Sequence, residues 1–220
     1  MYKNVAVIIP ALEKNRHSPE GDLVKFGDLS LLEWKLALVR NFVSDENIFV
    51  STPSKVVAKV VKACDVNAIH RKESDKMADV IVDAVKKTGK EIILWTHVTS
   101  PFVSAVDFKS MMDKFLKLDK KFDSLISVLK LQEFIMFRNA ALNFEILKVG
   151  ERKLIEPAYQ ITNGCYIARR ETYLKHRNYF GTKPFLYEID ALASMEIKEM
   201  DDLAIASHLI SLFFKKGLHV

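Results

Sequence analysis

Short apolar runs alternate along this chain with longer segments of helical periodicity. The apolar runs predict strands at residues 5–9, 48–51, 92–96, 125–129 and 165–168. Apolar residues that recur every three or four positions predict helices at residues 31–41, 55–64, 77–87, 106–118 and 201–216. Strands that alternate with helices favour βαβ units. We therefore expect a single α/β domain with a mostly parallel sheet flanked by helices.

The segment WTHVTSPF, residues 95–102, places polar side chains directly after the apolar strand at 92–96. Ligands of open α/β sheets bind beyond the carboxyl ends of the strands, so His97, Thr99 and Ser100 are candidate binding residues. The alternative for His97 is a structural histidine at a strand end. Ser104 and Asp107 have the spacing of a capping box, which predicts a helix start near residue 105.

Composition narrows the class of protein. With 220 residues, of which 49% are hydrophobic and 28% charged, the chain can form one domain with a sizeable core and is too apolar to be disordered. The net charge of +5 favours acidic ligands. The basic stretch at 114–121 also contains acid and is typical of a solvated helix face, so we expect no nucleic-acid partner.

Cysteine usage and hydropathy favour a soluble cytoplasmic protein. Cys64 and Cys165 are far apart and lack partners at metal-ligand spacing, which fits a reducing compartment. The apolar run at 5–9 is too short for a signal peptide, and no stretch is long enough to span a membrane. Residues 201–217 end in two lysines and a glycine, as packed C-terminal helices do, so we expect no membrane partner.

Four segments carry a resemblance to a known family. They are VAVIIPAL at 5–12, TSP at 99–101, FDSLISV at 122–128 and TNGCYIAR at 162–169. In order and spacing they resemble the acylneuraminate cytidylyltransferases, the CMP-sialic acid synthetase family, over almost the whole chain. The resemblance implies a nucleotide-diphospho-sugar transferase fold of Rossmann-like type. It also implies that a 2-keto acid sugar attacks the α-phosphate of CTP, giving CMP-sugar and pyrophosphate with Mg²⁺ assistance.

The loop at residues 10–22 corresponds to the family's triphosphate-binding loop. The resemblance implies nucleotide contacts from Pro10, Ala11, Leu12, Asn15 and Arg16, and catalytic charge from Arg16 and Lys14. Several residues depart from the family pattern: Leu12 stands for Arg, Lys14 for Gly, Arg16 for Lys, and Gly21-Asp22 for Lys-Asn. Arginine keeps a phosphate-binding cation with a different geometry. The alternative is a solvated loop with incidental charges.

Further binding residues are implied by the same resemblance. Arg71 matches the arginine of an Arg-Pro-x-Glu-Leu segment, after which Ser74 and Asp75 would contact the nucleotide. His97 takes a glutamine position that touches the acceptor sugar, and Thr99, Ser100, Gln160, Asn163 and Gly164 would also face the sugar. An Asn-Gly pair taken alone is typical of a hairpin turn.

The segment before the last helix corresponds to the family's metal-binding Asp-Ile-Asp. Glu196 matches its first acid and Lys198 replaces the second. An ammonium group cannot ligate Mg²⁺, so the resemblance implies Glu196 as the metal ligand, with Lys198 able to contact phosphate. For Asp201 and Asp202 we favour helix capping over metal ligation.

Residues 133–160 have the least regular pattern, and a comparable insertion of the family reaches a second subunit, which implies a homodimer. Two other functions stay open. A catalytically impaired nucleotide- or sugar-binding homologue would explain the altered loop. A glycosyltransferase on a related sheet is disfavoured, because no Asp-x-Asp follows Trp95. The sequence does not identify the acid sugar.

Overall fold

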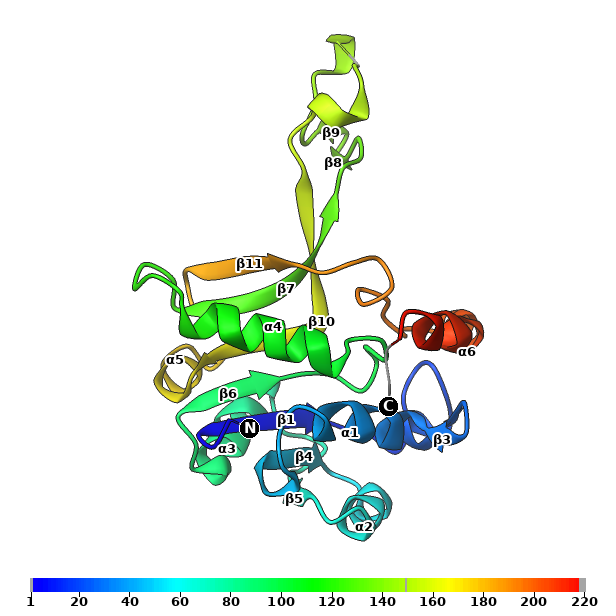
Figure 1. The fold of residues 1–220 in the computed structure, drawn as a ribbon, viewed down its shortest axis with the longest axis vertical. Coiled ribbons are helices and arrows are strands. Elements are labelled where there is room, and N and C mark those ends of the chain that lie inside the picture. The colour runs from blue at the N-terminus through cyan, green and yellow to red at the C-terminus, as the bar shows by residue number, and fades with distance from the viewer. Residues whose placement is uncertain (1, 149, 218–220) are drawn as a thin grey trace.

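The computed structural model describes residues 2–148 and 150–217, and a seven-stranded sheet runs through its centre (Figure 1). The strand order is β11-β7-β10-β6-β1-β4-β5. Neighbouring strands are parallel except for the two pairs that β10 makes with β6 and β7. The bounds of these strands are β1 Val5–Pro10, β4 Ile48–Thr52, β5 Asn67–His70, β6 Ile92–Trp95, β7 Ser124–Leu131, β10 Ala158–Arg169 and β11 Pro184–Glu188. The predicted α/β domain with a mostly parallel sheet is confirmed.

Helices cover both faces of this sheet. Their bounds are α1 Leu31–Arg40, α2 Lys55–Ala63, α3 Met77–Thr88, α4 Ala105–Leu116, α5 Arg170–His176 and α6 Met200–Lys215. Short elements complete the fold: β2 Lys25–Phe26, β3 Leu29–Ser30, β8 Met136–Phe137, β9 Ala140–Ala141, and the 3₁₀ turns η1 Gly21–Leu23, η2 Asp45–Asn47, η3 Ile146–Lys148 and η4 Arg152–Leu154. Each predicted helix is present, with ends within two residues of those expected from periodicity.

Two strands of the central sheet and one helix were not predicted, nor were the short elements. In β5 only Ile69 is buried, and β11 lies at the other edge of the sheet and begins at a proline, so neither shows a buried apolar run. The helix α5 has seven residues, which is too short to establish a period.

The core has two layers, one on each face of the sheet. Alternate residues of β1 enter different layers, since Val7 packs on the side of α1, α2, α4 and α6, whereas Ile8 packs on the side of α3 and α5. A strand covered on both faces must be apolar at successive positions, which explains the uninterrupted run VAVII.

Polar side chains fix the starts of the helices. Ser104 accepts from the Asp107 amide and Asp107 accepts from the Ser104 amide, so the predicted capping box is confirmed and α4 begins at Ala105. Asp202 accepts from the amides of Lys198 and Glu199 at the start of α6. The capping interpretation is therefore confirmed for Asp202.

The strand β10 is longer than predicted and contains a bulge. Its register with β7 shifts between Ile161 and Tyr166, and the Asn163-Gly164 pair lies inside this shift. The hairpin-turn interpretation of that pair is therefore wrong. The hydroxyl of Ser127 on β7 reaches into the bulge, lying 2.7 Å from the Thr162 hydroxyl and accepting from the Cys165 amide at 2.8 Å. Bulges of this kind re-aim side chains next to functional sites.

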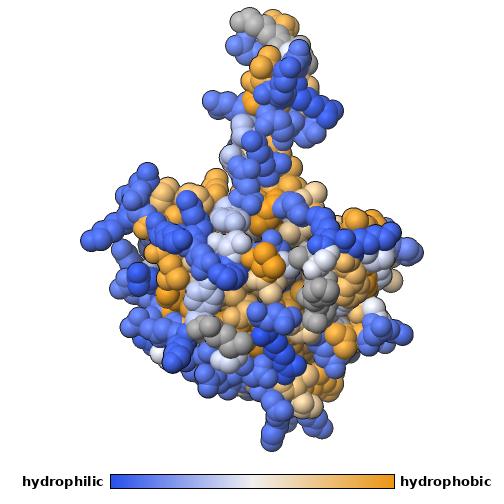
Figure 2. Space-filling model, viewed as in Figure 1, coloured by the Kyte–Doolittle hydropathy of each residue, from blue (hydrophilic) through white to orange (hydrophobic). Residues whose placement is uncertain are grey.

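An arm, described for residues 132–148 and 150–157, leaves the sheet between β7 and β10 and projects away from the body of the domain (Figure 1). It carries β8, β9, η3 and η4, and it corresponds to the insertion expected at 133–160, of which the last three residues belong to β10. Apolar and polar surface alternate along it (Figure 2). Leu147 is 97% exposed and Leu154 75% exposed.

The last helix, α6, packs against α1 through aromatic rings. Phe213 is fully buried, with ring centroids 5.6 Å from Trp34 and 5.8 Å from Phe102. Every helix in the described ranges is too short or too polar to cross a membrane.

Phe213→Ala is expected to lower the free energy of unfolding by about 3–5 kcal/mol, because it removes a buried ring and leaves a cavity. Phe214→Ala is the matched control, since that neighbouring ring is 46% exposed and its loss should cost clearly less. Urea denaturation followed by tryptophan fluorescence measures both variants. Equal losses would contradict the docking of α6 through Phe213.

Candidate functional site

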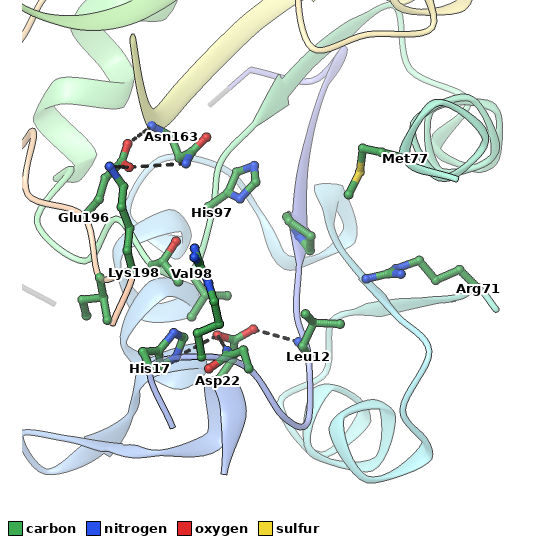
Figure 3. A pocket seen from close by; sticks show the side chains of 15 residues that line it. Leu12, His17, Asp22, Arg71, Met77, His97, Val98, Asn163, Glu196 and Lys198 are labelled. Carbon is green, nitrogen blue, oxygen red and sulfur yellow. Dashed lines mark hydrogen bonds and ion pairs between the residues drawn. The ribbon is translucent and has the colours of Figure 1, made fainter. Parts of the chain in front are cut away.

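A cavity of about 480 Å³ opens where β1 and β6 end (Figure 3). These strands are parallel neighbours, and the chain continues from β1 to β4 on one side and returns to β6 on the other. This is the switch point at which open α/β sheets bind ligands. Nine of the predicted site residues line the cavity: Pro10, Leu12, Asn15, Arg16, Arg71, His97, Thr99, Asn163 and Glu196.

Seven predicted site residues do not line this cavity. Three are buried. Ala11 continues β1 through a hydrogen bond to the Ser51 carbonyl, Ser100 is a buried residue of the turn after β6, and Gly164 packs inside the β10 bulge. Three are turned to other surroundings: Ser74 and Gln160 are exposed, and the Asp75 carboxylate accepts from the Lys72 amide. Lys14 lies in an adjoining cavity.

The adjoining cavity has a volume of about 570 Å³ and shares Leu12 and Arg71 with the first. Lys14 and Lys72 line it together with Glu13 and Glu73. Glu13 accepts a 2.5 Å hydrogen bond from Ser54, the N-cap of α2. Lys14 is therefore positioned beside the site and not in its centre.

The loop after β1 is held in place by Asp22, a residue for which the sequence suggested no role. Its buried carboxylate accepts from the Leu12 amide at 2.7 Å and from the Asn15 side chain at 3.0 Å. Burial raises the pKa of Asp22 to about 6, although both hydrogen bonds oppose this shift. The loop thus closes on itself through one carboxylate.

His17 packs beside Asp22 at the base of the cavity (Figure 3). Its Nε2 atom lies 3.5 Å from Asp22 Oδ1 and makes no hydrogen bond within the described residues. Burial lowers the pKa of His17, so the imidazole is neutral at neutral pH. Neither His17 nor Asp22 stands in a motif that would have revealed the pair from sequence.

His97 reaches into the wall of the cavity from the end of β6 (Figure 3). Its amide donates to the Asn163 carbonyl at 3.2 Å, and its ring meets Tyr166 and Tyr179 edge-on. The Nε2 atom is buried, with no hydrogen-bond partner in the part of the chain that the structure describes. Burial, and then the charge of Lys35, lower the pKa of His97 to about 4. A neutral imidazole can donate to a ligand or accept from it.

Glu196 reaches the cavity, as predicted, but its carboxylate is already engaged. It accepts from the backbone and side-chain amides of Asn163 and pairs with the Lys198 ammonium at 3.1 Å (Figure 3). The Glu196 side chain is only 6% exposed. The Ile197 amide between the pair donates to the Thr99 carbonyl at 2.8 Å, which fixes this segment against the turn after β6.

These donors do not fit a divalent ion held by the protein. The carboxylates that line the cavity are those of Asp22 and Glu196, and both are hydrogen-bonded. No group of three His, Cys, Asp or Glu residues within residues 2–148 and 150–217 is placed to hold a metal. Mg²⁺ is usually held by one or two carboxylates together with waters and substrate phosphates, so Glu196 would have to give up its present partners to act as a ligand, and the Lys198 ammonium cannot ligate a cation.

Three cations instead reach the cavity from separate segments. Arg16 comes from the β1 loop, Arg71 follows β5, and Lys198 precedes α6. Arg16 is exposed and pairs with Glu199 at 3.0 Å, an arrangement that contributes little in water. Arg71 is half-buried, burial lowers its pKa, and its Nε atom makes no hydrogen bond to any described residue. Arg71 is therefore the cation best prepared to bind an anion.

Comparison with known proteins finds similar sequences over nearly the whole chain. A family model described as "Cytidylyltransferase" matches residues 6–213. N-acylneuraminate cytidylyltransferase of Streptococcus agalactiae serotype III (strain NEM316) is 20% identical over 96% of this chain. The chain spans 57% of the length of that relative.

Solved structures show the same fold. CMP:2-keto-3-deoxy-manno-octonic acid synthetase complexed with CTP has a TM-score of 0.70 at 13% identity, covering 96% of this chain and 99% of that one. The 4-diphosphocytidyl-2C-methyl-D-erythritol synthase of Anaerococcus prevotii DSM 20548 has a TM-score of 0.71 at 14% identity, with coverage of 95% and 96%.

Gly21→Ala is expected to destabilise the protein more than Gly89→Ala. Both glycines have a positive φ, of 57° and 65°, so both variants incur the left-handed penalty of about 1–2 kcal/mol. A Cβ atom at residue 21 would also lie 2.4 Å from the Leu12 carbonyl oxygen. A Cβ atom at residue 89 would have no described atom within 4 Å. Equal free energies of unfolding in urea would show that the loop does not need this close approach.

Proposed function

The chain belongs to the cytidylyltransferase family, and we propose that it transfers the cytidylyl group of CTP to an acidic sugar of the 2-keto acid type, releasing pyrophosphate. The observation that carries this proposal is the convergence of Arg16, Arg71 and Lys198 on one cavity at the switch point of the sheet. Side-chain cations there can neutralise a triphosphate.

The nucleotide side of the proposed reaction depends on charge. Attack on the α-phosphate moves negative charge onto the leaving pyrophosphate, and positioned cations stabilise it. We assign this task to Arg71 and Arg16, with Lys198 at the wall opposite Arg71 (Figure 3). Lys14 lies in the adjoining cavity, where it can bind the far end of the triphosphate.

The acceptor side depends on His97 and Asn163. With a pKa of about 4, His97 is a weak base near neutral pH, so we assign it to orienting the sugar hydroxyl and not to removing its proton. Asn163 is held rigidly, because its Oδ1 atom accepts from the Tyr166 hydroxyl at 2.8 Å and its Nδ2 atom donates to Glu196. A fixed amide and a neutral imidazole suit a hydroxyl-bearing ligand.

The acidic acceptor is supported by the similarity to N-acylneuraminate cytidylyltransferase and by the cationic Lys198 at the cavity wall. A carboxylate on the sugar would gain from that charge. The divalent ion implied by the sequence resemblance stays a prediction, and no step proposed here runs through it.

A second candidate is a nucleotide- or sugar-binding homologue that has lost catalysis. Two observations favour it: Arg16 is exposed and already paired with Glu199, and Leu12 at the cavity carries no charge. Such a protein would bind CTP without releasing pyrophosphate.

CTP is expected to raise the melting temperature more than ATP, GTP or UTP, because a ligand that binds only the folded state stabilises it. Pyrophosphate release should then follow with N-acylneuraminate or 2-keto-3-deoxy-manno-octonic acid as acceptor, and not with 2-C-methyl-D-erythritol 4-phosphate.

Arg71→Met should weaken CTP binding by about 10–100-fold, the loss expected for charge-assisted hydrogen bonds.

Arg177→Met is the matched control, since Arg177 pairs with Asp79 on the exposed surface outside the cavity. It should leave CTP affinity unchanged. CTP binding without pyrophosphate release on any acceptor would support the second candidate. No stabilisation by CTP would refute both.

We also propose that the protein forms a homodimer through its arm. The arm exposes leucines that a single copy leaves uncovered, and it stands clear of the body of the domain (Figures 1 and 2). Apolar side chains on a projecting element are typical of an interface.

Leu147→Asp combined with Leu154→Asp is expected to convert the dimer into a monomer, because two buried charges would oppose association. Sedimentation velocity at micromolar concentration measures the change. Leu116→Asp, at a half-exposed position on α4 in the body of the domain, should leave the dimer intact. A monomeric wild-type protein would contradict the proposal directly.

A further inference from the structure

Lys35 of α1 is a fully buried lysine that the proposed reaction does not use. It stands on the apolar face of the helix, four residues after Leu31 and four before Val39. Its ammonium lies 5.4 Å from the centre of the Phe108 ring, and the negative charge of Asp107 on α4 favours its protonated form. A buried ammonium is costly unless it has a partner, so its hydrogen bond identifies its role.

That partner belongs to the turn that leads into the cavity. Lys35 Nζ donates to the Ser100 carbonyl at 2.5 Å, and the preceding residue, Trp34, donates through Nε1 to the Pro101 carbonyl at 2.7 Å. Two successive side chains of α1 thus hold two successive carbonyls of the turn. The turn is closed by the Ser100 amide, which donates to the His97 carbonyl at 3.2 Å. Lys35 is therefore linked to His97 through one residue.

Lys35 differs from Trp34 in carrying charge. Burial lowers the pKa of Lys35 to about 7, so the ammonium is protonated throughout the acidic range in which His97 would gain its own proton. Its positive charge adds to burial in lowering the pKa of His97. The effect is electrostatic, and the hydrogen bond to Ser100 fixes the position from which it acts.

Other titratable groups also face His97. Tyr166 and Tyr179 contact its ring, and burial raises the pKa of both, so they are uncharged in this range. Arg71, Glu196 and Lys198 line the same cavity, and the last two form an ion pair with each other. Lys35 is thus the cation that acts on His97 from inside the core.

We propose that Lys35 is a positioning residue: through the Ser100 carbonyl it fixes the turn that presents His97 at the strand exit, and its charge adds to burial in disfavouring the protonated imidazole, so that His97 can accept a hydrogen bond from the ligand. An imidazolium can only donate, so it could no longer accept a hydrogen bond from the acceptor hydroxyl. The ligand part of this inference rests on the proposed function, whereas the state of His97 does not.

The test compares Lys35→Met with Trp34→Phe. Each variant leaves one turn carbonyl without its α1 donor, but only the first removes a charge. The titration of the His97 ring is followed by NMR of its Cε1–H signal, assigned with His97→Gln. Lys35→Met should move the midpoint up by about one pH unit, the effect of a neighbouring like charge. Trp34→Phe should leave it in place.

A midpoint that stays put in Lys35→Met, or moves equally in both variants, would overturn the proposal. If Lys35→Met does not fold, the wild-type protein still decides, because the Lys35 ammonium must be protonated between pH 4 and pH 6 in a lysine Nζ titration. A neutral Lys35 in that range would refute the charge effect. These measurements need no activity, so failure of the proposed function would be recognised separately, by the absence of pyrophosphate release.

Discussion

The parallel pairing of β1 with β6 is the constraint on which the site depends. The register Val5↔Ile92 to Ile8↔Trp95 brings the loop after Pro10 and the turn at His97 to the same edge of the sheet. The antiparallel β10 pairs with β6 on the other side and brings Asn163 to that edge through its bulge. Hydrogen bonds then join the three segments, since the Thr96 amide donates to the Ile8 carbonyl of β1 at 3.1 Å, while the Thr96 hydroxyl donates to the Gly164 carbonyl at 2.6 Å. A cavity assembled in this way keeps its shape without a ligand, which lowers the cost of binding.

Buried polar groups hold the segments around this cavity in place. Asp22 closes the first loop, Lys35 holds the turn after β6, and Glu196 joins the segment before α6 to the β10 bulge. Each is charged or chargeable, and each is hydrogen-bonded where it is buried, as its desolvation cost requires. The carboxylates of Asp22 and Glu196 already accept hydrogen bonds from the protein. The side chains left to meet a ligand are cationic or neutral, which explains why the cavity suits a polyanion and a hydroxyl group better than a bare metal ion.

The sequence could predict the central strands and the helices because each carries its own apolar pattern. It could also predict His97, since a polar residue after a buried strand lies at the binding edge wherever the helices pack. It could not predict the bulge, because Asn163-Gly164 is locally typical of a turn and its register is set by Ser127, 36 residues earlier in the chain. The role of Asp22 could not be predicted either, because its partners, Leu12 and Asn15, come within hydrogen-bond distance only in the folded loop. Lys35 did leave a signal, namely a lysine on the apolar face of a helix, but its partner Ser100 lies on another element.

The charge around the cavity also bears on whether the proposed nucleotide could bind at a loop that departs from its family pattern. Leu12 and Gly21 carry no cation, yet Arg71 and Lys198 reach the same space from other segments. Coulomb attraction depends on distance and dielectric and not on chain position, so affinity for a triphosphate survives when a cation is supplied from elsewhere. Rate is more demanding, because a transition state is stabilised only by groups placed where charge develops. Binding should therefore tolerate this rearrangement better than catalysis, and the balance between the two rests on how far Arg16 leaves Glu199 when the nucleotide arrives.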